Sequence, residues 1–88
     1  MKLLILYRPR SEHARSVEEF VANLERSYHD NQIVLTDVDS VEGTTEAELY
    51  DVMQYPAILA IANDGSLLKG WIGDQLPLID EVGGWLRS

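Results

Sequence analysis

The sequence predicts a single α/β domain over residues 1–88, with the element order βαβαββα and a four-stranded mixed sheet flanked by three helices. Two observations carry this prediction. Short apolar runs alternate with segments of helical period, and the last two apolar runs are joined by a tight turn. The 88 residues suffice for one layered core but not for two.

The first predicted strand is the apolar run Leu3–Leu6, whose lack of alternation is typical of a central strand buried on both faces. A helical period follows from Ser11, which is predicted to cap the helix, and Pro9 prevents an earlier start. The helix is expected to end near residues 29–31. Its buried stripe is predicted to comprise Ala14, Val17, Phe20, Val21, Leu24 and Tyr28.

The second predicted strand, Ile33–Val38, is rich in β-branched residues, and the helix before it implies a parallel pair with a right-handed crossover. Residues 42–45 then interrupt the pattern. Thr45 and Glu48 form a capping-box pattern, which predicts a short helix through about Val52 or Met53. The residues of this helix that are predicted to face the core are Ala47, Tyr50 and Met53.

The third and fourth predicted strands, Ala57–Ala62 and Leu67–Ile72, are joined by a turn at residues 63–66 and form an antiparallel hairpin. A last helix follows, with Pro77 in its first turn. The Gly83-Gly84 pair costs this helix about 1 kcal/mol per glycine relative to alanine, which predicts a frayed end or close packing. The residues predicted to be buried here are Trp71, Leu76, Ile79, Val82, Trp85 and Leu86.

Composition excludes several kinds of chemistry. The chain has no cysteine, so disulfides, thiolate metal sites and thiol reactions are ruled out. Its net charge is −8, and no lysine or arginine lies between Arg26 and Lys69, an interval rich in aspartate and glutamate. An acidic surface repels nucleic acid and anionic membranes, so neither is an expected partner. The same surface can also serve solubility alone.

The N-terminal segment has one charge and four apolar residues before Tyr7, which is far short of a signal peptide. No segment approaches the roughly 20 apolar residues that a membrane-spanning helix needs. The expected location is therefore cytoplasmic. We expect no cofactor, and a monomer or a weak homodimer through the edge strand Ile33–Val38.

The element order, the helix directly after the turn at residues 8–11, and Tyr55-Pro56 before the third strand resemble the thioredoxin superfamily, in particular its glutaredoxin-type members. In that family a Cys-x-x-Cys motif opens the first helix and a cis-proline packs beside it. Here Ser11-Glu12-His13-Ala14 stands at the place of the motif, and Pro56 matches the cis-proline. Because Ser11 and Ala14 replace both thiols, the family's thiol-disulfide oxidoreductase activity does not carry over.

The start of the first helix is the candidate site. Its free N–H groups and the basic residues around it could receive a carboxylate or phosphate, although the arginines could instead pair with Glu12, Glu18 and Glu19. His13 titrates near neutrality but has no partner that spacing fixes for Ser/His catalysis, and it lies too far from His29 for a shared metal. The resemblance implies that the Tyr55 backbone binds extended peptide.

The sequence therefore predicts a redox-inactive binding or scaffolding module that recognises a peptide, a protein or a small anion at the former active-site face. The predicted binding residues are Arg8, Arg10, Ser11, His13, Arg15, Tyr55 and Pro56. The alternative is a glutathione- or anion-binding transferase-like enzyme. It would use Tyr7 and Ser11 as glutathione transferases use a hydroxyl near a bound thiolate, with Gly73-Asp74 at the place where glutaredoxins hold the amino end of glutathione.

Overall fold

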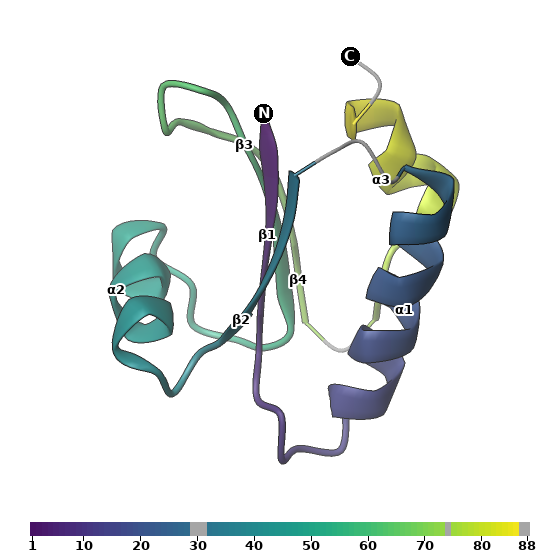
Figure 1. Cartoon of the computed structure of the whole chain (residues 1–88). Helices are drawn as coiled ribbons and strands as arrows, with labels where there is room; N and C mark the ends of the chain where they lie inside the picture. The colour runs from purple at the N-terminus through teal and green to yellow at the C-terminus, as the bar shows by residue number, and fades with distance from the viewer. Residues whose placement is uncertain (29–31, 74, 87–88) are drawn as a thin grey trace.

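The computed structural model describes residues 1–28, 32–73 and 75–86, and it confirms the predicted α/β class. The sheet has four strands in the order β2-β1-β3-β4. Figure 1 shows α2 on one face of this sheet and α1 with α3 on the other. The elements are β1 (Lys2–Tyr7), α1 (Ala14–Ser27), β2 (Gln32–Asp37), α2 (Val41–Leu49), β3 (Ala57–Ile61), β4 (Leu67–Ile72) and α3 (Ile79–Leu86).

Strand β1 lies at the centre of the sheet, parallel to β2 and antiparallel to β3. Leu3 and Ile5 face α1 and α3, whereas Leu4 and Leu6 face α2, and all four are at most 2% exposed. The prediction of a strand buried on both faces is therefore confirmed. The molecule has two apolar layers, one on each side of the sheet.

The predicted cap of α1 is wrong. The helix begins at Ala14 with His13 at the cap position, and the Ser11 hydroxyl donates to the carbonyl of Arg8. The reason is that residues 8–14 form two successive turns, from Arg8 to Ser11 and from Ser11 to Ala14, before the helix starts. The predicted buried stripe is confirmed at Ala14, Val17, Phe20, Val21 and Leu24, and Tyr28 is partly buried just after the helix. The predicted end at residues 29–31 lies outside the described residues.

The predicted start of α2 is also wrong. Ser40 caps the helix by accepting from the N–H of Gly43, and Thr45 lies inside the helix, bonded to the carbonyl of Val41. Gly43 lies inside the helix and does not interrupt it. A Cβ at this position would clash with the carbonyl oxygen of Asp37. This glycine lets α2 approach the end of β2 closely.

The end of α2 and the chain after it differ from the prediction as well. The helix ends at Leu49, and Asp51 adopts a positive φ of 56°, which is incompatible with continuing the helix to Val52 or Met53. Ala47 is buried and Tyr50 is partly buried, as expected, but Met53 is 82% exposed. Met53 points away from the core because it belongs to the connection into β3.

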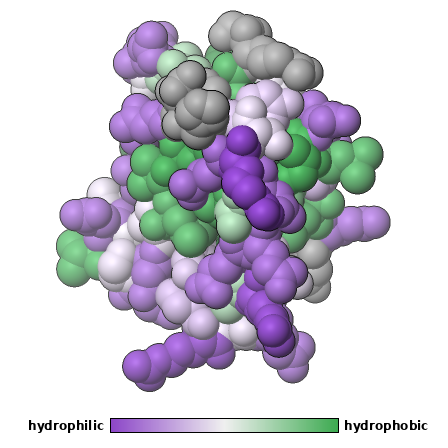
Figure 2. All heavy atoms as spheres, turned by 45° about the vertical axis from the view of Figure 1, so that its right-hand side comes forward, coloured by the Kyte–Doolittle hydropathy of each residue, from purple (hydrophilic) through white to green (hydrophobic). Residues whose placement is uncertain are grey.

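Strands β3 and β4 form the predicted antiparallel hairpin. Helix α3 begins at Ile79, so Pro77 precedes the helix and does not occupy its first turn. Val82 and Leu86 are buried, while Leu76, Ile79 and both tryptophans are partly buried. Figure 2 brings the side with α1 and α3 forward, where hydrophilic residues cover most of the surface.

Gly83 allows α3 to pack against the end of α1. A Cβ at Gly83 would lie 2.0 Å from the Tyr28 hydroxyl oxygen and 2.3 Å from the ring carbon that carries it. Gly84 is in the same helix, but a Cβ there would meet no atom within 4 Å. The close packing predicted for this glycine pair is thus confirmed at Gly83.

These two glycines form a matched pair for a stability test. Gly84→Ala is expected to raise the free energy of unfolding by up to about 1 kcal/mol, because alanine has the better helix propensity. Gly83→Ala is expected to lower it by about 1–3 kcal/mol, because the Tyr28 ring must move. Urea denaturation followed by circular dichroism measures both. A Gly83→Ala variant as stable as Gly84→Ala would contradict the packing of α3 on Tyr28.

Candidate functional site

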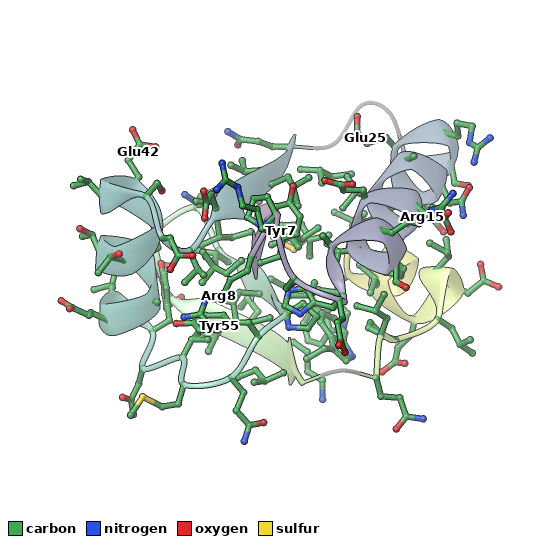
Figure 3. All side chains as sticks on the ribbon, turned by 90° about the horizontal axis from the view of Figure 1, so that it is seen from below. Tyr7, Arg8, Arg15, Glu25, Glu42 and Tyr55 are labelled. Carbon is green, nitrogen blue, oxygen red and sulfur yellow. The ribbon has the colours of Figure 1, made fainter. Side chains whose placement is uncertain are left out.

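A groove with a volume of about 770 Å³ lies at the carboxyl end of β1. One wall is the loop before α1 together with the first turn of that helix, and the other is the connection from α2 into β3. Figure 3 views this end of the molecule, with Arg8 and Tyr55 between α1 and α2. We call it the Pro56 groove, and the residues that line it are Arg8, Ser11, Glu12, His13, Ser16, Val17, Met53, Gln54, Tyr55, Pro56, Gly73 and Leu76.

The backbone of Arg8 organises the loop before α1. Its carbonyl accepts from the Ser11 N–H at 3.1 Å and from the Ser11 hydroxyl at 2.7 Å. Its N–H donates to Nε2 of His13 at 3.2 Å. The hydrogen bonds fix Ser11 and His13 beside Arg8 in the groove.

The side chain of Arg8 links the two walls of the groove. Its Nε lies 3.5 Å from Oδ2 of Asp39, and its guanidinium carbon lies 5.2 Å from the centre of the Tyr55 ring. The Arg8 and Asp39 side chains are more than half exposed, so the ion pair contributes little to stability. The contact with Tyr55 is a cation–π interaction that holds a positive charge at the mouth of the groove.

The other two candidate arginines lie elsewhere. Arg10 borders a smaller hollow of about 350 Å³ beside Asp37 and Asp39. Arg15 lies on the exposed side of α1, where its Nε is 3.6 Å from Oε1 of Glu19. Arg15 thus pairs with Glu19, which the sequence analysis gave as the alternative to anion binding. Among the described residues, Arg8 is the arginine that lines the Pro56 groove.

Tyr55 and Pro56 form the opposite wall. Their peptide bond is cis, and Pro56 is buried whereas Tyr55 is half-buried. The carbonyl of Pro56 accepts from the N–H of Gly73 at 3.0 Å, which ties this segment to the end of β4. Within the described residues, neither the N–H nor the C=O of Tyr55 has a hydrogen-bond partner. The main chain of Tyr55 is therefore available to a ligand.

Six residues that line the groove were not predicted as binding residues: Glu12, Ser16, Val17, Met53, Gln54 and Leu76. Ser16 lies in the first turn of α1, and Val17 and Leu76 were expected only as core residues. Met53 and Gln54 directly precede Tyr55-Pro56. Their position next to a proline that stops a helix was a signal that they belong to a loop.

Tyr7 lies behind the groove and does not line it. Its side chain is 7% exposed, and its hydroxyl donates to Oε2 of Glu18 at 2.9 Å. Burial raises the pKa of Tyr7 above its usual value of 10.0, and the hydrogen bond to the Glu18 carboxylate raises it further. The Tyr7 hydroxyl thus stays protonated and is used inside the protein.

Residues 1–28, 32–73 and 75–86 contain no group of three or more His, Asp or Glu side chains placed to hold a metal ion. None of the helices they form combines the length and the apolar character needed to cross a membrane. Two residues named in the sequence analysis lie outside the described residues: His29, in connection with a metal site, and Asp74, in connection with glutathione.

Comparison with protein families and with curated proteins finds no match. Solved structures do match. Thioredoxin 1 from Thermosipho africanus has a TM-score of 0.71 at 15% identity, covering 99% of this chain and 91% of its own. A thioredoxin from Schistosoma mansoni has a TM-score of 0.70 at 24% identity, covering 98% and 77%. Mitochondrial thioredoxin 3 from Saccharomyces cerevisiae has a TM-score of 0.72 at 20% identity, covering 97% and 74%.

These structures are similar to the chain over nearly its whole length, and their identities are low enough that the similarity concerns the fold. The resemblance expected from the element order and from Tyr55-Pro56 is confirmed at that level. The chain has a thioredoxin-like fold and contains no Cys-x-x-Cys motif.

Proposed function

We propose that this chain is a redox-inactive binding module that recognises an extended segment of a peptide or protein in the Pro56 groove. The observation that carries the proposal is the open groove between the loop before α1 and Tyr55-Pro56 in a chain without a single thiol. Thiol-disulfide exchange needs a thiolate, so a groove of this form in this chain can bind but cannot exchange disulfides.

The main chain of Tyr55 supports an extended ligand. A peptide that runs alongside it could accept from its N–H and donate to its C=O, as an added strand does at a sheet edge. Unpaired backbone groups are normally satisfied by protein, water or ligand, so this position favours a partner with its own backbone groups. A small anion would satisfy the N–H alone.

The side chains of the groove favour a ligand with mixed chemistry. Arg8 contacts Asp39 through its Nε, and its side chain is more than half exposed, so its guanidinium is accessible to a carboxylate or a carbonyl of a ligand. Met53 is 82% exposed and offers a flexible apolar surface, with Leu76 partly buried in the lining. A segment with an acidic or polar residue next to an apolar one fits both features.

The alternative, a transferase-like enzyme, has less support. It needs a hydroxyl that donates to a bound thiolate. A hydroxyl can donate one hydrogen bond. The Tyr7 hydroxyl already donates to Glu18, and the Ser11 hydroxyl already donates to the carbonyl of Arg8. Both hydroxyls would have to break an internal hydrogen bond before they could act on glutathione.

Peptides selected from a random library on the immobilised protein test the binding function. The selected peptides are expected to shift the amide resonances of Gln54 and Tyr55 in ¹⁵N-labelled protein. Arg8→Glu is expected to weaken their binding by about tenfold or more, which is ~1.4 kcal/mol, because it reverses the charge at the mouth of the groove.

Arg15→Glu is the matched control, because it makes the same change on the exposed side of α1 and is expected to leave affinity unchanged. Millimolar glutathione is added as a competitor and is expected not to displace the peptides. Peptides that shift a different surface, or an equal loss of affinity in both variants, would refute the groove as the site. Displacement by glutathione would favour the transferase-like alternative.

The protonation of Tyr7 is tested by pH. Because folding raises its pKa, Tyr7 contributes stability that is fully present below about pH 10 and is lost as the pH rises through the raised pKa. The free energy of unfolding is therefore expected to fall less steeply above pH 10.0 in Tyr7→Phe than in the wild type. Absorbance of tyrosinate near 295 nm, compared between the wild type and Tyr7→Phe, shows whether Tyr7 is the last tyrosine to ionise. A Tyr7 that ionises at or below the usual tyrosine pKa would contradict the buried hydrogen bond to Glu18.

A further inference from the structure

Strand β4 is an edge strand with an apolar and uncovered surface. Leu67 and Leu68 are each 44% exposed and Ile72 is 50% exposed. The strand contains no acidic residue, although the chain has 15. The opposite edge, β2, has Leu35 at 37% exposure as its exposed large apolar side chain, and it ends in Asp37.

The register between β3 and β4 shows which backbone groups of β4 point outward. Gly73 donates to the carbonyl of Pro56, and Trp71 and Lys69 lie opposite Ile58 and Ala60. Hydrogen-bonded pairs alternate along an antiparallel ladder, so Lys69 and Trp71 also bond to β3. The N–H and C=O groups of Gly70 and Ile72 are then directed away from β3, toward the open edge.

We propose that β4 pairs with β4 of a second copy of this chain, antiparallel and with Gly70 opposite Gly70 of that copy. A two-fold axis through this pair places the outward N–H and C=O of each Gly70 against those of the other. The same register places Leu68 of each copy opposite Ile72 of the other. A continuous sheet of eight strands results, since each copy contributes four.

Charge complementarity supports the second copy as the occupant. In this register Lys69 of each copy lies opposite Trp71 of the other, in a pair without direct backbone hydrogen bonds, where side chains come closest. Trp71 donates from Nε1 to Oε2 of Glu81 at 2.8 Å. Lys69 already lies 5.9 Å from the Trp71 ring within its own chain. The dimer would thus bring Lys69 of each copy close to Trp71 of the other copy and to the Glu81 carboxylate bonded to that Trp71.

Two other pairings of the same strand are less favourable. A two-fold axis at Lys69 would oppose two like charges, which destabilises a strand pair. The bulge between Ala60 and Ile61 leaves Leu68 without an opposite residue in β3. A pairing centred nearer the turn would therefore use an irregular part of β4. Gly70 adds no side chain at the centre of the contact, which lets the two backbones approach.

The solution mass measured by sedimentation equilibrium tests the proposal. The contact is short, so protein concentrations up to about 1 mM are needed. A salt concentration of about 0.15 M screens the net charge of each copy. We expect a concentration-dependent dimer. Gly70→Pro removes an N–H that points outward and leaves the bonds to β3 in place, so it is expected to abolish the dimer without changing the circular dichroism spectrum.

Charge reversal provides a test that does not depend on the proline variant folding. Lys69→Glu and Glu81→Lys are each expected to weaken the dimer about tenfold, and the double variant is expected to restore it, because it exchanges the two charges across the axis. Leu35→Lys on β2 is the control and is expected to dimerise as the wild type does. A monomer at all concentrations, a dimer that survives Gly70→Pro, no rescue in the double variant, or loss of the dimer in Leu35→Lys would overturn the proposal.

Discussion

The burial of β1 on both faces is the constraint on which the rest of the structure depends. Because Leu3 to Leu6 are at most 2% exposed, α2 must cover one face of the sheet, and α1 and α3 the other. β1 also pairs with strands on both sides, so its position in the sheet is fixed. The chain must leave β1 at Tyr7 and reach α1 through a short loop, and this exit is where the groove forms.

The site follows from how that loop is closed. The backbone of Arg8 makes hydrogen bonds to Ser11 and His13, so the residue after β1 determines where both side chains lie. The side chain of Arg8 then reaches Asp39 after β2 and Tyr55 before β3. One arginine thus connects two segments that follow β1 and β2 with a third segment that precedes β3. A substitution at Arg8 affects the charge of the groove and the position of its walls.

Apolar periodicity was sufficient to predict the class, the order of the elements and the central strand, because burial acts on nearly all of β1 and β3 and on one face of α1. The helix caps were not predictable in this way. Gly43 was predicted to interrupt the pattern. Its place inside α2 depends on a close approach to Asp37, which is a tertiary contact that the sequence pattern does not reveal. Ser11 was predicted to cap α1. Its hydroxyl instead donates to the carbonyl of Arg8, a hydrogen bond that depends on the fold of the loop. For the same reason Arg8, Arg10 and Arg15 could not be told apart from the sequence.

We infer that residues 11–14 stand at the place of the Cys-x-x-Cys motif and keep a turn that two thiols could bridge. The Ala14 N–H lies 3.3 Å from the carbonyl of Ser11, so the segment is a turn whose end Cα atoms are within about 7 Å of each other, which is compatible with a disulfide. The direct measurement is insulin reduction and disulfide mapping of the double variant Ser11→Cys with Ala14→Cys. We expect an intramolecular disulfide and a gain of dithiol exchange. A folded variant with two thiols that form no disulfide and reduce no substrate would contradict the account.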